Sequence, residues 1–264
     1  MKYTYEQLAK MIDHSLLHPT MTDQELDDGC RVAAKYGVAS VCIKPYAVKP
    51  AAKLLKETGV LVGAVIGFPH GNSTTESKRY ETELACKDGA AEIDMVINIG
   101  KALGGDFDYV QRDIQAVCDQ AHERGAKVKV IFETDYLTRG GAGLSSDDFK
   151  RRLCRISESA GADWVKTSSG YGFVKQPDGS YNYKGATEHD LALMRASVSA
   201  KVQVKAAGGV RDLDGLIKVR DLGATRCGAT ATAAMMDEYR RREAAEACGQ
   251  SVAAEGSGIG KGGY

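Results

Sequence analysis

Glu92-Ile93-Asp94-Met95-Val96-Ile97 is a short run in which carboxylates alternate with apolar side chains. Successive side chains of a β-strand point to opposite faces, so Ile93 and Met95 would share one face and Glu92 and Asp94 the other. In a barrel of strands, one face packs against helices and the other faces the interior. The run therefore predicts a barrel strand that carries acidic groups inward.

Similar β-branched runs recur along the chain, and most are followed by a stretch with apolar residues at helical spacing. The expected strands are Ile12–Leu16, Ala39–Ile43, Val60–Ile66, Glu92–Ile97, Lys127–Phe132, Asp163–Thr167, Val202–Ala206 and Ala224–Gly228. Helices are indicated at Ser77–Lys87, Asp108–Arg124 and Asp147–Ala160, with Gly125, Gly161 and Gly223 where helix ends are expected. Strands that alternate with helices form a parallel sheet, and eight such units favour closure. We predict an α/β fold, a (β/α)8 TIM barrel with an extra N-terminal helix.

The 264 residues suit one such domain, because TIM barrels need roughly 250 residues. We expect a single barrel domain over residues 1–252 and a flexible tail over residues 253–264, which are mostly Gly, Ala and Ser. The segment Phe173–Lys184 interrupts the alternation of strands and helices and contains a Pro-Asp-Gly turn signal. This insertion predicts a small hairpin above the active site of the barrel, where it could cover the mouth of the site or contact a neighbouring subunit.

The charge balance argues against polyanionic partners, since 35 Lys and Arg face 35 Asp and Glu. Nucleic acid and anionic membranes are therefore not expected as partners. The N-terminal stretch has no signal-peptide pattern and no apolar run could cross a bilayer, so we expect a cytoplasmic protein. Seven cysteines show no spacing that suits a metal, and we expect reduced thiols, Cys42 among them, and no metal site.

The same alternation directs three lysines into the predicted barrel. Lys129, Lys166 and Lys205 each oppose apolar neighbours on their strands, and each is expected near the strand's C-terminal end, where TIM barrels carry their active sites. A single strand lysine is often a solvent-reaching or salt-bridged side chain. Three enclosed lysines beside Asp94 would cost several kcal/mol if uncompensated, which favours a functional interpretation.

Enclosed lysines suit amine nucleophiles. An ordinary lysine, with a pKa of about 10.4, is almost wholly protonated at neutral pH. Burial and a neighbouring cation both lower that pKa, and a nearby carboxylate could move protons directly or through water. Lys166, Lys205 and Asp94 thus predict Schiff-base chemistry.

Glycines follow the last two strands, in Ala207-Gly208-Gly209-Val210 and Cys227-Gly228-Ala229-Thr230. Glycine lets backbone N–H groups approach an anion, and the loops after strands seven and eight often bind phosphate in TIM barrels. Each motif taken alone is equally compatible with a plain turn.

Five motifs in order resemble deoxyribose-phosphate aldolase, a class I, metal-independent aldolase. They are Asp13-His14-Ser15, Gly67-Phe68-Pro69-His70-Gly71, Glu92-Ile93-Asp94-Met95-Val96, Lys166-Thr167-Ser168-Ser169-Gly170 and Val204-Lys205-Ala206-Ala207-Gly208-Gly209-Val210. The similarity runs from about Ile12 to Thr232. It implies reversible cleavage of 2-deoxy-D-ribose 5-phosphate to D-glyceraldehyde 3-phosphate and acetaldehyde, without a cofactor, by a homo-oligomer that is a dimer or tetramer.

The resemblance also implies residue roles. Lys166 would form the Schiff base, Lys205 would lower its pKa, and Asp94 would donate and accept protons through a water. Lys129 and Asp13 match supporting positions, for which a purely structural ion pair is the alternative. Backbone near Gly170, Gly208, Gly209 and Thr230 would hold the phosphate, and the terminal Tyr264 would assist proton transfer unless the tail is merely disordered.

Some features depart from the family pattern. Ala229-Thr230-Ala231 offers one hydroxyl where relatives often carry serines, so phosphate would depend more on backbone donors and bind more weakly. Two other functions stay open. One is a lysine aldolase for a different sugar phosphate, and the other is a barrel that binds a sugar phosphate without catalysis.

Overall fold

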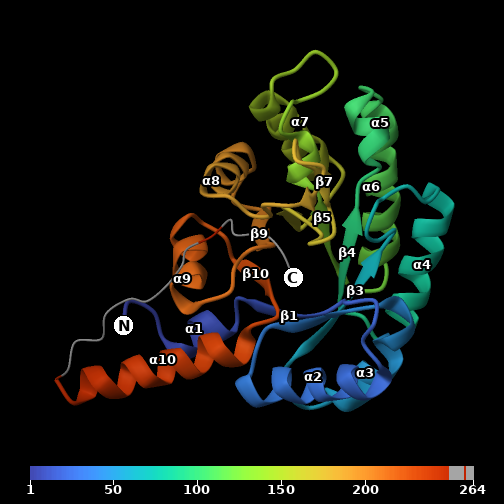
Figure 1. The fold of residues 1–264 in the computed structure, drawn as a ribbon. Helices are drawn as coiled ribbons and strands as arrows, with labels where there is room; N and C mark the ends of the chain where they lie inside the picture. The colour runs from blue at the N-terminus through green and yellow to red at the C-terminus, as the bar shows by residue number, and fades with distance from the viewer. Residues whose placement is uncertain (250–258, 260–264) are drawn as a thin grey trace.

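Eight parallel strands close into a barrel in the computed structural model of the protein, which describes residues 1–249 and Ile259 (Figure 1). The order around the barrel is β1-β10-β9-β6-β5-β4-β3-β2, and β1 pairs with both β10 and β2. Their bounds are β1 Ile12–Leu16, β2 Ser40–Ile43, β3 Leu61–Ile66, β4 Glu92–Val96, β5 Lys127–Ile131, β6 Trp164–Lys166, β9 Gln203–Ala207 and β10 Arg226–Ala229. The predicted TIM barrel is confirmed.

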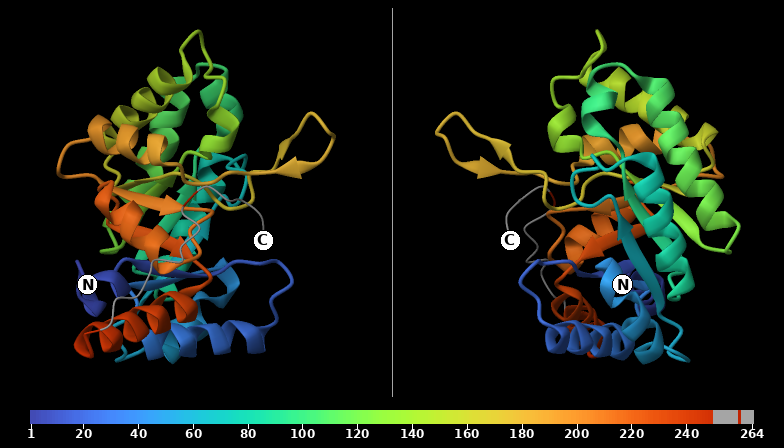
Figure 2. Two further views of the ribbon diagram at one scale, coloured as in Figure 1. Left: turned by 60° about the vertical axis from the view of Figure 1, so that its left-hand side comes forward. Right: turned by 90° about the vertical axis from the view of Figure 1, so that its right-hand side faces the viewer.

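Helices surround the barrel and alternate with its strands (Figures 1 and 2). They are α1 Tyr5–Ala9, α2 Asp23–Tyr36, α3 Val48–Leu54, α4 Thr75–Lys87, α5 Ile99–Leu103, α6 Phe107–His122, α7 Ser146–Ser159, α8 Glu188–Ser197, α9 Leu213–Asp221 and α10 Thr232–Ala247, with short 3₁₀ turns η1 Pro45–Ala47 and η2 Thr134–Leu137. The extra N-terminal helix is α1, which precedes β1 as predicted.

Local sequence signals account for where the helices begin and end. Thr22 caps α2 and forms a reciprocal capping box with Glu25, and Ser145 caps α7. Gly125 and Gly161 follow α6 and α7 with φ angles of 75° and 92°, which glycine adopts without steric cost. These glycines allow the chain to turn from each helix into the next strand.

The core confirms the alternation predicted for β4. Ile93 and Met95 are fully buried in the layer between strands and helices. Val128 and Val130 of β5 and Val204 of β9 occupy the same layer, so the strands present apolar side chains outward and charged ones inward. Lys127 faces inward by parity but lies at the start of β5 and is exposed.

The predicted insertion hairpin is present. Strands β7 Val174–Lys175 and β8 Tyr181–Asn182 pair antiparallel, and Gly179 N–H donates to the carbonyl of Gln176 in the connecting turn. Figure 2 shows the hairpin projecting away from the barrel. The expectation that it lies above the site is therefore wrong for most of its length, because only its base returns to the barrel end.

Among the residues placed by the structure, no helix is long and apolar enough to span a membrane. The predicted tail over residues 253–264 falls, apart from Ile259, outside the described residues.

Candidate active site

Lys166 ends β6 inside the barrel, beside Asp94 of β4 and Lys205 of β9. Its Nζ donates to Asp94 Oδ2 at 2.7 Å, and Lys205 Nζ donates to the same oxygen, also at 2.7 Å. All three side chains are buried. The structure thus brings together the three residues that the sequence predicted as a reactive group.

Lys129 and Asp13 extend this group. Lys129 Nζ lies 3.0 Å from Asp13 Oδ2 and 3.1 Å from Asp94 Oδ1. Asp13 also accepts from Lys205 Nζ at 2.5 Å, so one carboxylate bridges two of the lysines. Both predicted supporting residues are therefore in direct contact with the group around Lys166.

The lysines differ in their positions along the strands. Lys166 is the last residue of β6, whereas Lys129 and Lys205 stand in the middle of β5 and β9. The expectation that all three lie near strand ends is wrong for these two. Lys129 pairs in register with Trp164, two residues before Lys166, whereas Lys205 pairs with Lys166 itself. Both amines contact carboxylates from β1 and β4.

Two further charged residues complete the interior: Glu92, which was predicted to face inward, and Arg226, which was not predicted. Arg226 of β10 binds Glu92 Oε1 through Nη2 at 2.5 Å and contacts Asp13 through Nη1. Glu92 also accepts from Lys129 Nζ at 2.5 Å. Parity could have found Arg226, since Cys227 faces the buried outer layer and its neighbour must face inward.

The barrel interior can contain these buried charges because carboxylates and basic groups are present in nearly equal numbers. Among the described residues of this network, three carboxylates face four basic groups: Asp13, Glu92 and Asp94 against Lys129, Lys166, Lys205 and Arg226. A buried net charge is costly. When Lys166 is neutral, three positive charges face three negative charges. The network as a whole therefore favours the unprotonated amine.

The pKa values follow the same logic. Burial lowers the pKa of Lys166; the attraction of Asp94 opposes this change, and the Lys205 cation reinforces it. Burial also acts to lower the pKa of Lys205, but Asp13 and Asp94 outweigh it and hold that pKa well above its usual value. Lys205 therefore stays charged beside a lysine that loses its proton more readily.

Asp94 and Lys129 remain ionised. Burial would raise the pKa of Asp94, but the cations of Lys129, Lys166 and Lys205 hold it well below its ordinary range. The carboxylates of Asp13 and Asp94 overcome burial and raise the pKa of Lys129 to about 12. The carboxylate next to Lys166 is thus a hydrogen-bond acceptor that orients the amine.

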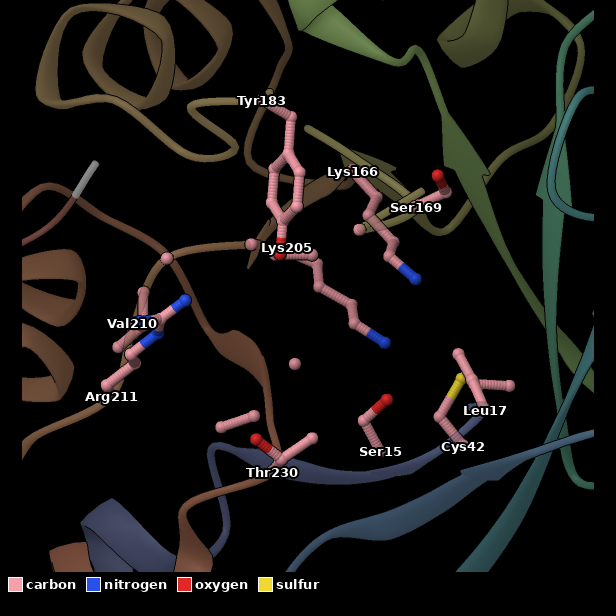
Figure 3. A pocket seen from close by; sticks show the side chains of 16 residues that line it. Ser15, Leu17, Cys42, Lys166, Ser169, Tyr183, Lys205, Val210, Arg211 and Thr230 are labelled. Atoms are coloured by element: carbon pink, nitrogen blue, oxygen red, sulfur yellow. The ribbon is translucent and has the colours of Figure 1, made fainter. Parts of the chain in front are cut away.

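A pocket opens from Lys166 and Lys205 toward the glycine loops (Figure 3). The residues predicted to bind phosphate all line it, namely Gly170, Gly208, Gly209 and Thr230. The side chain of Arg211, which the sequence analysis did not assign, lies on the same side as Val210. One cavity therefore contains both a buried amine and a set of groups suited to an anion.

The sequence comparison agrees with this geometry, because residues 7–236 match the DeoC/LacD family of aldolases. The chain belongs to the DeoC/LacD family of aldolases. A deoxyribose-phosphate aldolase of Rhodopirellula baltica is 50% identical over 240 residues, covering 91% of this chain and 92% of the relative. One from Thermococcus gammatolerans is 43% identical over 238 residues, covering 89% and 98%.

Solved structures give the same assignment for this DeoC/LacD aldolase. The tetrameric deoxyribose-phosphate aldolase structure from Aeropyrum pernix aligns with a TM-score of 0.76 at 29% identity, covering 90% of this chain and 92% of that chain. The alignment includes most of the barrel, so the fold and the family agree.

One buried acid of this DeoC/LacD aldolase was also missed. Glu133 follows β5 with a φ of 58°, uncommon for a residue with a side chain, and its carboxylate accepts the N–H of Ser169 at 3.2 Å. Burial raises its pKa to about 7, although the hydrogen bonds from Ser169 oppose that change. Parity does not apply beyond the strand end, so no sequence pattern indicates the position of Glu133.

Two further predictions concern single residues of the aldolase. Cys42 is buried, lines the pocket and lies 3.8 Å from Asp94 through its Sγ, and burial raises its pKa to about 11. A protonated, packed thiol agrees with the expectation. Tyr264 lies outside the described residues.

Proposed function

We propose that the chain is a class I deoxyribose-phosphate aldolase that cleaves 2-deoxy-D-ribose 5-phosphate reversibly to D-glyceraldehyde 3-phosphate and acetaldehyde. The observation that supports this most directly is the buried Lys166 amine, 2.7 Å from Asp94, at the end of a pocket lined by glycine loops. The curated relatives from Rhodopirellula baltica and Thermococcus gammatolerans carry this name.

The first stage joins enzyme and substrate. The neutral Lys166 amine attacks the C1 aldehyde of the open-chain sugar, and the resulting carbinolamine loses water to give an iminium ion. Asp94 takes up and returns protons in this stage with a water molecule as carrier. Because nearby cations lower the pKa of Asp94, it holds a proton only briefly before passing it on.

The second stage breaks the carbon–carbon bond. Loss of the C3 hydroxyl proton lets the C2–C3 electrons flow into the iminium, which releases glyceraldehyde 3-phosphate and leaves an enamine on Lys166. Protonation at C2 restores the iminium, and water then releases acetaldehyde and the free amine. Asp94 serves this step through the same water, and Tyr264 is proposed to assist at C2.

Lys205 keeps the nucleophile reactive. Its cation disfavours a proton on Lys166, and its bonds to Asp13 and Asp94 keep it in place. Lys129 and Asp13 are proposed to support this arrangement by extending the network. Glu92 and Arg226 close the network at its deeper end.

Phosphate is proposed to bind on the backbone of Gly170, Gly208 and Gly209, with Thr230 as a hydroxyl donor. The φ angles of Gly208 and Gly209 are 85° and 81°, a conformation that glycine adopts readily. Arg211 adds a positive side chain to this end of the pocket. Anion binding here would hold the sugar so that its aldehyde reaches Lys166.

Reductive trapping tests the central claim. The protein is incubated with acetaldehyde and borohydride, and the ethylated lysine is located by peptide mass spectrometry. Modification of Lys166 is expected, with Lys166→Arg as the untrapped control. Selective modification at another lysine would contradict the proposal.

Product analysis tests the substrate. Wild-type protein with 2-deoxyribose 5-phosphate should release equal amounts of acetaldehyde and glyceraldehyde 3-phosphate. Trapping at Lys166 without these products would favour a different sugar phosphate, and neither trapping nor turnover would favour a binding protein.

We also propose a homo-oligomer, a dimer or tetramer. The support is the tetrameric structure of the Aeropyrum pernix enzyme, to which this chain is similar. Light scattering coupled to gel filtration tests the proposal, and a monomeric mass at micromolar concentration would contradict it.

A further inference from the structure

The inserted hairpin returns to the barrel along the glycine loop that follows β9. Ala186 N–H donates to the carbonyl oxygens of Ala207 at 3.0 Å and Gly208 at 3.1 Å. A Cβ on Gly185 would lie only 2.6 Å from the carbonyl carbon of Gly208, so the two backbones are in contact. The base of the hairpin is therefore part of the pocket wall.

A buried carboxylate fixes this base. Asp135 accepts the N–H of Lys184 through Oδ1 at 2.6 Å and the N–H of Gly185 through Oδ2 at 2.9 Å. Asp135 lies in η2, directly after β5. The residue before this pair, Tyr183, is thus held against a rigid part of the barrel although the hairpin itself projects outward.

Tyr183 is the hairpin residue that enters the pocket. Its side chain is buried and its ring packs edge-on against Phe173, with ring centroids 5.4 Å apart. Figure 3 shows the ring descending into the pocket, while the amines of Lys166 and Lys205 point away toward Ser15 and Cys42. Its hydroxyl end therefore belongs to the glycine-loop side of the cavity.

The chemistry on that side is that of an anion site. A Cβ on Gly208 would lie 3.4 Å from Tyr183 Cε2, so the ring stands directly beside the loop. Gly228–Ala231 opposite carries one hydroxyl, that of Thr230. A phenol hydroxyl can donate a hydrogen bond to a phosphate oxygen, and such charge-assisted bonds are stronger than neutral ones.

We propose that Tyr183 is a specificity residue whose hydroxyl donates a hydrogen bond to the substrate phosphate, so that the inserted hairpin helps to select phosphorylated sugars. The inference rests on the proposed function for the identity of the substrate. The contact of Tyr183 with the glycine loop, and the position of both in the pocket wall, do not depend on that function.

Tyr183→Phe tests the proposal, because it removes the hydroxyl and keeps the ring that packs on Phe173. The readout is kcat/KM for 2-deoxyribose 5-phosphate divided by kcat/KM for 2-deoxyribose. Loss of a hydrogen bond to a charged group should lower this ratio about tenfold or more, mainly through KM. Tyr181→Phe is the matched control, since Tyr181 lies on the same hairpin and is 63% exposed.

An unchanged ratio in Tyr183→Phe, or an equal fall in Tyr181→Phe, would overturn the proposal. A second measurement is independent of the reaction: the Kd of inorganic phosphate by calorimetry should rise about tenfold in Tyr183→Phe. Equal Kd values would overturn the role of Tyr183. Absence of turnover by the wild-type protein would instead overturn the proposed function, and the phosphate titration would still decide the role of Tyr183.

Discussion

Glu133 binds Ser169 through two groups at once, accepting its backbone N–H at 3.2 Å and its hydroxyl. Ser169 stands three residues after Lys166 and lines the pocket. A buried acid beyond the end of β5 thus fixes the loop that follows the nucleophile.

The raised pKa of Glu133 predicts a pH-dependent stability. The folded value is about 7 and the ordinary value is 4.5, so the unfolded chain binds fewer protons between these pH values. This contribution to stability is complete below pH 4.5 and is lost as pH rises through 7, by about 3 kcal/mol. Urea unfolding of Glu133→Gln across this range should lack that loss.

Glu123→Gln is the control, because it makes the same chemical change at an exposed position. Gly172→Ala probes the same contact with Glu133 intact, since a Cβ there would lie 2.5 Å from Glu133 Cδ. This variant should raise KM for the sugar phosphate by displacing the Ser169 loop. A Glu133→Gln stability curve parallel to the wild-type curve would refute the prediction.

Lys205→Met should move the reactivity of Lys166 to higher pH. The substitution removes a cation and leaves Asp94 more strongly attracted to Lys166, and both changes raise the pKa of Lys166. Borohydride trapping at neutral pH should slow by about tenfold or more and recover as pH rises. A pH–rate profile with an unshifted midpoint would remove Lys205 from this role.

The same variant should lose stability, because Asp13 and Asp94 each lose a buried partner. Breaking a buried ion pair from one side costs about 3–5 kcal/mol. Trapping rates are therefore measured at a temperature where circular dichroism shows a folded protein. Lys201→Met, at an exposed position shortly before β9, is the control for lysine removal.

Arg226→Met should affect stability more than reactivity. Arg226 pairs with Asp13 and Glu92 and makes no direct contact with Lys166 among the interactions described. We expect a loss of about 3–5 kcal/mol in unfolding free energy. The folded fraction should trap acetaldehyde with a smaller change in rate than Lys205→Met, because Arg226 acts on Lys166 only through the charge balance of the network. Arg240→Met, with a half-exposed side chain, should cost little. Full stability in Arg226→Met would be incompatible with this account.

His14 should make the protein sensitive to acid. Its ring is buried beside Thr232, with Nδ1 2.8 Å from Oγ1, and burial lowers its pKa from 6.5 to about 4. The unfolded chain binds the proton first, so stability is complete above pH 6.5 and falls by about 3 kcal/mol toward pH 4. The difference in unfolding free energy between wild type and His14→Asn should shrink over this range.

The sequence predicted the barrel well because each strand carries its own signal. Alternation in β4 and β5 is enough to place Asp94 and Lys129 inside, since the parity of a strand is a local property. Lys166 and Lys205 were found in the same way. Their mutual contact with one oxygen of Asp94 depends on register between strands, which no single strand encodes.

Residues outside regular alternation were harder to predict. Arg226 stands in a short strand with a glycine, where parity is easily overlooked, and Glu133 lies past a strand end in a left-handed conformation. The hairpin was recognised from its Pro-Asp-Gly turn, but its direction depends on Asp135 and Gly208, which are distant in sequence. Tertiary contacts determine these features.

The contact between Asp13 and Arg226 joins residues 213 positions apart, at the seam where β1 meets β10. The last strand must dock before the network around Lys166 is complete, and pairing between segments so far apart in sequence is intrinsically slow. Until then the lysine has an ordinary pKa and stays protonated. The burial and the Lys205 cation that lower the pKa of Lys166 exist only in the closed barrel, so the amine becomes a nucleophile at neutral pH only when the whole chain has folded.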